Sequence, residues 1–128
     1  MSYAGEIGRI GEQMVADYLK TQGYIIFAQN FRSNFGEIDI VAENRELLAF
    51  VEVKTRAKDS LVDPADAVDR IKQSKIIKTA YEFRRKAHHL GGYRFDVAEV
   101  TYRKDENGET KFSLNYIINA FFGDLERD

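Results

Sequence analysis

Hydrophobic and polar residues follow two periodicities along the chain, one typical of helices and one typical of strands. In residues 5–21 the apolar positions recur at 3.6-residue spacing, which predicts an amphipathic helix that ends before Gly23. A second helix is predicted from Pro64 to about Lys86, because proline suits a first helical turn and Asp63 can cap it. Each helix needs a partner surface to cover its apolar face.

Five shorter apolar segments bounded by turn residues predict strands. Asn44-Arg45 is a short connection that favours an antiparallel hairpin, and Asn107-Gly108 is a strong hairpin-turn signal. The element order α-β-β-β-α-β-β predicts an α/β fold in which a central mixed β-sheet is flanked by helices. The strands are expected at residues 24–27 with an extension to 31, 38–42, 47–55, 93–102 and 111–118.

The composition is that of one ordinary globular domain, residues 1–128, with 44% hydrophobic and 31% charged residues. No apolar run is long enough to span a bilayer, and the first residues lack the basic and apolar stretches of a signal peptide. We therefore expect a cytoplasmic protein with no membrane partner. The absence of cysteine excludes disulfides and thiolate metal sites.

The formal net charge of −2 limits how the chain could bind nucleic acid. A domain that binds nucleic acid by charge alone is usually strongly basic, so phosphate binding here needs locally gathered cations or divalent metal ions. The second predicted helix is the most basic part of the chain, and Lys72, Gln73, Lys75 and Lys78 are its candidate nucleic-acid contacts. A solvated helix face, with lysine stems covering apolar surface, accounts for the same pattern.

Two neighbouring predicted strands carry the clearest chemistry. Glu52 and Lys54 lie two residues apart and share one face of their strand, and Asp39 lies on the strand before. If these strands pair as a hairpin, the three side chains converge. They could be the wet face of a half-buried hairpin. The apolar residues around them favour central strands instead, where charges are seldom found unless paired or metal-bound.

Two carboxylates and a lysine are what magnesium-dependent phosphodiester hydrolysis requires. Mg²⁺ (or Mn²⁺) prefers oxygen ligands, which makes Asp39 and Glu52 candidate metal ligands, with the main-chain carbonyl of Val53 as a third. Such an ion polarises the phosphate and lowers the pKa of a water. Lys54 can orient that water and counter developing charge, and Arg56 can contact a phosphate.

Asp39 followed by residues 52–54 (EVK) resembles the signature of the PD-(D/E)xK nuclease superfamily, with Ile38 at the position of its proline. The resemblance implies a restriction-endonuclease-like core and a metal-dependent endonuclease acting on DNA, in branched or single-stranded form. The chain also resembles a narrower group, the YraN-like family of small bacterial proteins, which is similar to archaeal Holliday-junction resolvases. The residues that carry this resemblance are 8–12 (GRIGE), 36–39 (GEID), 50–56 (FVEVKTR) and 94–97 (RFDV).

The resemblance extends to residues on the two helices. Resolvases of this type often carry an acidic residue on the first helix, and Glu12 is the matching position, where it either completes the metal site or faces solvent. Related nucleases place a glutamine or lysine on the second helix, which matches Lys72 and Gln73. Gly8 and Gly11 indicate the close approach of a backbone or a phosphate, or loose helix packing.

Four further interpretations follow from the sequence and the resemblance. Junction-cleaving nucleases of this fold act as dimers, which implies a homodimer as an expectation. Phe121 and Phe122, with Tyr116 and Ile118, are either core residues or an apolar patch for self-association or for a protein partner. A non-catalytic nucleic-acid-binding or scaffold protein that retains the nuclease fold is the alternative function, although the intact Asp–Glu–Lys set favours the enzyme. Arg94 and Asp96 share a strand face, which predicts a structural ion pair.

Overall fold

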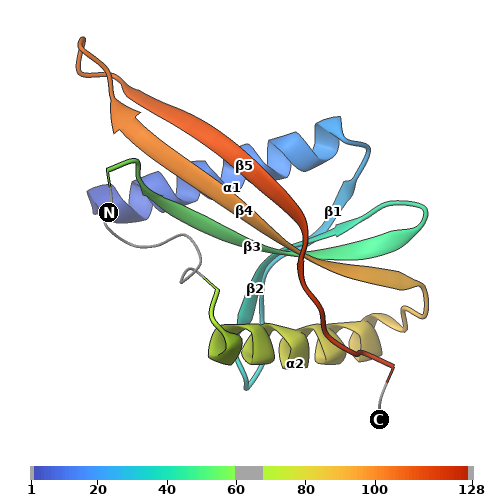
Figure 1. Ribbon diagram of the computed structural model, residues 1–128. Coiled ribbons are helices and arrows are strands. Elements are labelled where there is room, and N and C mark those ends of the chain that lie inside the picture. Colours follow the sequence, from blue (N-terminus) through green and yellow to red (C-terminus); the bar gives the residue numbers. More distant parts are fainter. Residues whose placement is uncertain (1, 60–67, 127–128) are drawn as a thin grey trace.

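Five strands form one mixed sheet whose spatial order follows the chain, β1-β2-β3-β4-β5 (Figure 1). The computed structural model describes residues 2–59 and 68–126. Both the α/β class and the element order α-β-β-β-α-β-β are as predicted. The elements are α1 (Tyr3–Thr21), β1 (Ile25–Arg32), β2 (Glu37–Glu43), β3 (Leu47–Ala57), α2 (Arg70–Ala87), β4 (Gly92–Lys104) and β5 (Thr110–Phe121).

The sheet joins an antiparallel meander to an antiparallel hairpin through one parallel pair. β1, β2 and β3 are antiparallel neighbours, as are β4 and β5, whereas β3 and β4 run parallel from Leu47↔Gly92 to Ala57↔Tyr102. Parallel neighbours need a crossover connection, and the segment that contains α2 provides it. The β4–β5 hairpin turns at Gly108, whose positive φ of 79° suits the predicted Asn107-Gly108 turn.

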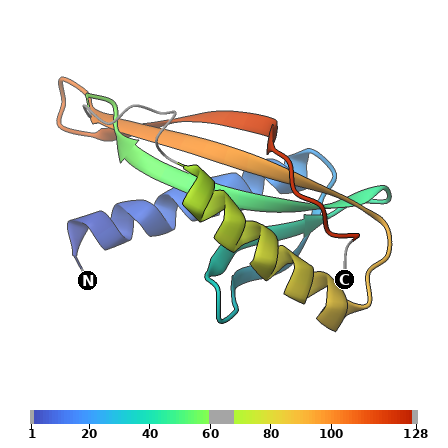
Figure 2. The same cartoon turned by 60° about the horizontal axis from the view of Figure 1, so that its bottom comes forward.

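The two helices pack on opposite faces of this sheet (Figures 1 and 2). The α1-side cluster contains Val15 and Leu19 of the helix together with alternate residues of the strands, such as Val51 and Val100. The α2-side cluster is more aromatic; it is built from Phe50, Phe83, Phe95, Phe121, Ile38, Leu48 and Ile76. The prediction of a helix on either face of a central sheet is therefore confirmed. Neither helix in the described ranges is both long and apolar enough to cross a membrane.

The helix boundaries follow their caps. The Ser2 hydroxyl accepts a hydrogen bond from the Gly5 N–H at the start of α1, and Gly23, with φ of 91°, follows its end. α2 begins at Arg70, because the Asp69 carboxylate accepts the Lys72 N–H at 2.8 Å. The predicted start near Pro64 was therefore wrong. The predicted cap Asp63 and Pro64 itself lie outside the described residues.

The two phenylalanines near the C-terminus have different environments. Phe121 is buried and stacks on Phe95, with 5.1 Å between ring centroids. Phe122 is 83% exposed, although it is the next residue. Phe121 is thus a core residue, and only Phe122 is available to an outside partner.

Gly11 allows α1 to approach β3 closely. A methyl group added at Gly11 would overlap the hydroxyl and methyl groups of Thr55, so the helix could not keep this distance with a larger residue. At Gly8 an added methyl group would meet no atom within 4 Å. Of the two interpretations, close backbone approach therefore explains Gly11, whereas Gly8 faces open space.

The predicted Arg94–Asp96 ion pair lies at the centre of a buried network. Asp96 has no exposed surface, and its carboxylate accepts hydrogen bonds from the Arg94 guanidinium at 2.8 Å and from the Tyr116 hydroxyl at 2.7 Å. The Asn119 main-chain N–H adds a third donor at 3.0 Å, and Arg94 also donates to the Tyr24 hydroxyl at 2.6 Å. This network ties β4 to β5 and to the chain before β1, so its role is structural.

Candidate active site

The candidate site lies in a fork where β2 and β3 separate (Figure 1). Main-chain pairing of these strands ends at Ile40↔Val51, while β3 continues to Ala57 beside β4 alone. The next main-chain donor on that side of β3 is the Val53 N–H, and the Asp39 carboxylate accepts it at 2.7 Å. The side chain of Asp39 thus takes the place of a carbonyl acceptor, which fixes the carboxylate against β3.

A sharp twist of the β1–β2 ribbon turns Asp39 toward the fork. Ile38 packs in the α2-side cluster and Ile40 in the α1-side cluster, although the two residues would share a face in a regular strand. Asn30, which the register places opposite Asp39, has a left-handed φ of 54°. The regular alternation of side chains between the two faces is therefore broken at Asp39.

Glu52 is the second buried carboxylate in the fork. Its side chain is only 7% exposed, and its carboxylate forms an ion pair with the Lys72 ammonium at 2.7 Å. Lys72 lies in the first turn of α2, so the second helix delivers a cation to the site. This contact supports a place for Lys72 in the site rather than a lysine that merely covers apolar surface.

Glu12 reaches the same carboxylates from α1. The pKa of Glu12 is raised by burial, by the charges of Asp39 and Glu37, and by a hydrogen bond between the Glu12 and Asp39 carboxyl groups. Glu12 is half-buried and does not face solvent freely. It borders a cleft of about 420 Å³ whose other lining residues are Gly5, Gly8, Arg9, Val53, Lys54 and Thr55.

Burial raises the pKa values of the carboxyl groups in the fork. Burial, then the charge of Asp39, raises the pKa of Glu52 to about 7, even though Lys72 and Lys54 oppose the shift. Burial also raises the pKa of Asp39 against the lowering effect of the Val53 N–H. For Glu12, burial and the charges of Asp39 and Glu37 act in the same direction. Such clustered, raised pKa values are typical of functional sites.

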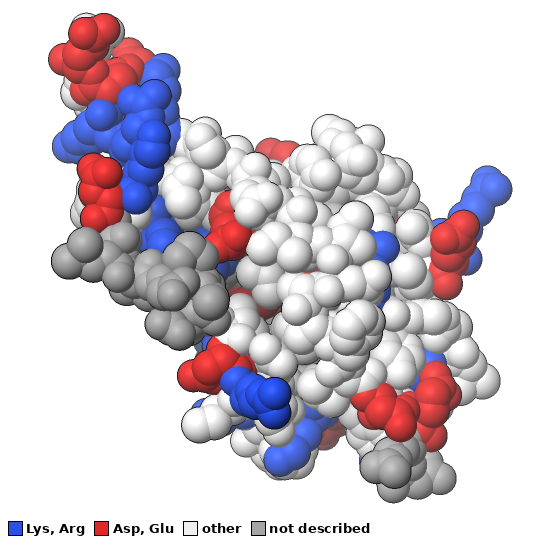
Figure 3. Space-filling view, viewed as in Figure 1, with Lys and Arg blue, Asp and Glu red and all other residues white. Residues whose placement is uncertain are grey.

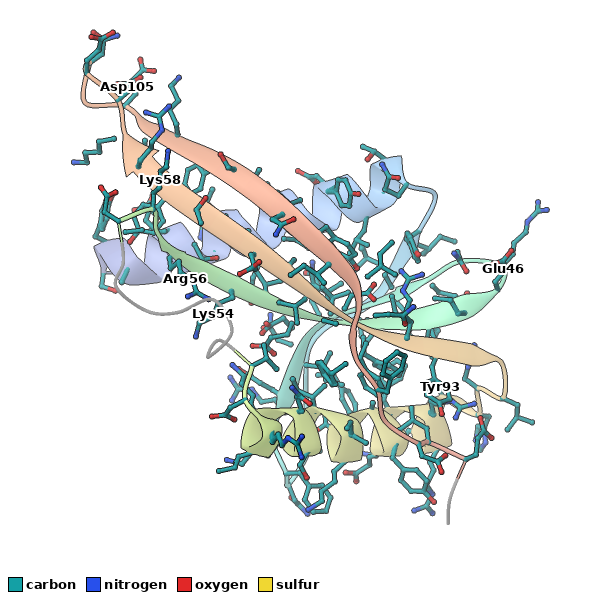
Figure 4. The ribbon with its side chains drawn as sticks, in the orientation of Figure 1. Glu46, Lys54, Arg56, Lys58, Tyr93 and Asp105 are labelled. Carbon is teal, nitrogen blue, oxygen red and sulfur yellow. The ribbon has the colours of Figure 1, made fainter. Side chains whose placement is uncertain are left out.

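The remaining predicted contacts lie on two sides of the fork. Lys54 and Arg56 follow Glu52 along β3, both half-buried (Figure 4). On α2, the Gln73 amide donates to the Val68 carbonyl at 2.9 Å, so it is engaged at the start of its own helix. The other two α2 lysines lie toward the β1–β2 turn, with Lys75 near Gly36 and the Lys78 ammonium 5.4 Å from the Phe35 ring centroid.

Two features of the site were missed in the sequence. Nothing in the sequence indicated that Lys72 would pair with Glu52, because that contact depends on how α2 packs on the sheet. The cleft wall could have been found, since Gly5, Gly8 and Glu12 are spaced i, i+3 and i+7 and so share one helix face.

In the described ranges, no three His, Cys, Asp or Glu side chains are grouped to hold a metal ion.

Glu52 is expected to make the metal-free protein less stable as the pH rises. Its folded-state pKa of about 7 exceeds the ordinary value of 4.5, so between these values the folded protein binds more protons than the unfolded chain. The free energy of unfolding therefore falls as the pH rises from 4.5 to 7. Glu52→Gln should raise Tm at pH 8 and leave it little changed near pH 4.5, measured by circular dichroism. Glu46→Gln, in the exposed β2–β3 turn, is the matched control, and equal Tm shifts in both variants would contradict this account.

The fold defines the class of the protein: it is an α/β protein with a five-stranded mixed sheet between helices, compatible with a nuclease-like fold. The candidate site within this fold contains two buried carboxylates beside lysines. The chain belongs to the uncharacterised protein family UPF0102, whose model matches residues 11–100. The predicted resemblance to the YraN-like family is thereby confirmed. The matched range includes Glu12, Asp39, Glu52, Lys54 and Lys72.

Relatives in clostridia are similar over nearly their whole length. A UPF0102 protein of Clostridium botulinum (strain 657 / Type Ba4) is 42% identical over 118 residues, which cover 91% of this chain and 94% of that protein. A UPF0102 protein of Clostridium perfringens is 39% identical over 120 residues, 93% of this chain and 96% of that protein. The similarity therefore includes both helices and all five strands.

Proposed function

We propose that this protein is a metal-dependent nuclease that hydrolyses phosphodiester bonds, with DNA in branched or single-stranded form as its substrate. The observation that carries the proposal is the fork itself, where two buried carboxylates with raised pKa values, Asp39 and Glu52, lie beside lysines and next to an open cleft. Buried carboxylates are stabilised by a paired cation or by a bound metal ion. A divalent cation at the fork would offset the burial that raises both pKa values.

The donor set suits Mg²⁺ or Mn²⁺. Asp39 and Glu52 offer carboxylate oxygens, the Val53 main-chain carbonyl follows Glu52 directly, and Glu12 is an accessory carboxylate hydrogen-bonded to Asp39. Hard divalent ions take such oxygen ligands, commonly one or two carboxylates with waters and substrate phosphate oxygens. When bound, the ion would polarise the phosphate and lower the pKa of a water near it.

The side chains of the fork have distinct roles in this proposal. Asp39 is held in place by the Val53 N–H, so its carboxylate is positioned before any ligand arrives. Lys54 lines the cleft, where its ammonium can orient the attacking water and counter charge on the phosphoryl oxygens. Lys72 holds the Glu52 carboxylate from α2 and can offer its ammonium to a phosphate. Gly8 keeps the cleft open beside them.

Metal binding and cleavage test the proposal together. Mn²⁺ titrated by calorimetry should bind wild type, and Asp39→Asn should weaken that binding at least tenfold, or about 1.4 kcal/mol. The asparagine oxygen can still accept the Val53 N–H, so the fold should persist. Cleavage is then assayed on junction, flap and single-stranded DNA and on RNA. Undiminished Mn²⁺ binding and cleavage in clean preparations of Asp39→Asn would exclude this site.

A second candidate is a non-catalytic nucleic-acid-binding protein that retains the fold. The specific observation in its favour is the Lys72–Glu52 ion pair at 2.7 Å, in which a lysine ammonium already neutralises one of the two carboxylates. Binding would then weaken with salt, need no Mg²⁺ and be unaffected by Asp39→Asn. Alanine at Lys75 and Lys78 should weaken it. Wild type that binds DNA in EDTA but cleaves nothing in Mn²⁺ would favour this candidate.

A further inference from the structure

β3 carries a row of charged side chains that starts at the fork and runs toward the free end of the sheet. Side chains alternate along a strand, so those on the α2 side of β3 are Phe50, Glu52, Lys54, Arg56 and, just beyond the strand, Lys58. The intervening residues face α1, where Val51 joins the α1-side cluster and Thr55 touches Gly11. Figure 4 shows Lys54, Arg56 and Lys58 in succession along β3.

The next two strands extend the same polar face. The parallel register sets Lys54 beside Glu99 and Arg56 beside Thr101. The antiparallel register then sets Asn115, Ser113 and Lys111 beside Glu99, Thr101 and Arg103. Val100 and Leu114 point to the other face and pack on the α1 side, as does Lys104, whose ammonium lies over the Tyr3 ring. We use the name distal sheet face for six residues on the α2 side of these strands: Lys54, Lys58, Arg103, Lys111, Ser113 and Asn115.

Positive charge dominates the distal sheet face, although the chain as a whole has a net charge of −2. Figure 3, which views this face, shows Lys and Arg gathered along the β4–β5 hairpin, with Asp and Glu at its turn. Glu99 lies within this face, between Lys54 and Asn115, and accepts a hydrogen bond from the Asn115 amide at 3.1 Å. Lys111 pairs with Glu109 at 3.2 Å and with Asp105 at 3.8 Å, at the turn end. Lys58 and Arg103 are both exposed.

We propose that the distal sheet face binds the sugar-phosphate backbone of the nucleic-acid strand that leads away from the fork, a surface separate from α2. The inference rests on the proposed function for the class of partner. Lys54 and Lys58 are four residues apart, or about 13 Å along the strand, so they can meet phosphates of different nucleotides. Ser113 and Asn115 supply short neutral groups of the kind that bond phosphate oxygens. None of the six side chains is apolar, which favours a polyanion over a lipid surface or an apolar peptide.

The length of the face sets the size of the ligand. From Glu52 to Lys58 the chain advances six residues, or about 20 Å along a strand. A dinucleotide held at the fork spans a single phosphate step and cannot reach Lys58 and Arg103, whereas a strand of a dozen nucleotides can. The substrate class is therefore a polynucleotide with an extended arm on the β3 side of the cleaved bond.

Length-dependent binding tests this inference. The double variant Lys58→Gln/Arg103→Gln is compared with Lys20→Gln/Arg45→Gln, which removes two exposed cations from other parts of the surface. Fluorescence anisotropy of labelled single-stranded DNA is measured in EDTA, so that cleavage cannot interfere. With 20-nucleotide strands the first variant should bind at least about fivefold more weakly at 100 mM salt, and its salt slope should fall by about 1.4. With dinucleotides it should match wild type, and the control should match wild type throughout.

The outcomes separate this inference from the proposed function. Equal 20-nucleotide binding by both double variants, with wild type binding and cleaving, would overturn the distal sheet face and leave the nuclease in place. Wild type that neither binds nor cleaves any nucleic acid would remove both. Binding to phosphatidylserine vesicles but not to oligonucleotides would assign the face to a membrane and also overturn the proposal. Unchanged thermal unfolding of both variants establishes that they are folded.

Discussion

Replacing Lys54 by alanine should lower the rate of metal-dependent cleavage by about 100- to 1000-fold, the usual effect of removing one group that stabilises developing charge. Lys54 lines the cleft beside Glu12 and Val53, and it follows Glu52 on the same face of β3. Its ammonium is the cation nearest along the strand to both proposed metal ligands. The loss should appear in kcat, because the group acts on the reacting phosphate more than on the bound strand.

Controls distinguish a catalytic from a structural role for Lys54. Lys20→Ala removes an exposed cation from the last turn of α1 and should leave kcat unchanged. Mn²⁺ binding by Lys54→Ala, measured by calorimetry, should stay within a few-fold of wild type, because a lysine is not a ligand. If Lys54→Ala cleaves at the wild-type rate, lysine has no part in the chemistry, and a different group must position the water.

Asp96→Ala should destabilise the fold by about 3–5 kcal/mol, the cost of removing one partner from a buried ion pair. The carboxylate is fully buried and accepts from Arg94, from the Tyr116 hydroxyl and from the Asn119 N–H. Without it, the Arg94 guanidinium and two further donors would stay buried with fewer partners. Urea unfolding followed by circular dichroism measures the difference.

Tyr116→Phe provides the comparison for Asp96→Ala. It removes a single hydrogen bond to the same carboxylate and should cost about 1 kcal/mol. A loss below 1 kcal/mol for Asp96→Ala would mean that the network contributes little to stability. Cleavage by Asp96→Ala at temperatures where it is folded should match wild type, since Asp96 is not part of the fork.

The element order could be predicted from the sequence because it depends on local patterns. The 3.6-residue spacing in residues 5–21 and the Asn107-Gly108 turn are each decided by neighbours along the chain. The start of α2 was misjudged because two places in the sequence carry residues that favour the start of a helix: Asp63 with Pro64, and Asp69. Only tertiary structure selects between them, and the helix begins at Arg70.

The site was predictable in its residues more than in its geometry. Alternation on β3 places Glu52 and Lys54 on one face, and hairpin pairing brings Asp39 close, so these three could be named beforehand. The twist at Asp39 could not, because it depends on the left-handed backbone of Asn30 on another strand. The Glu12–Asp39 hydrogen bond likewise requires α1 to approach β3 as closely as Gly11 allows.

Pairing β3 with β4 joins residues far apart in the chain, since Leu47 lies opposite Gly92. The two antiparallel units can form from local contacts, but this parallel pair must close a long loop first, which slows folding. Lys72 reaches Glu52 only after that closure has docked α2 on the sheet. A chain in which only the two antiparallel units have formed therefore lacks the Lys72–Glu52 contact of the candidate site.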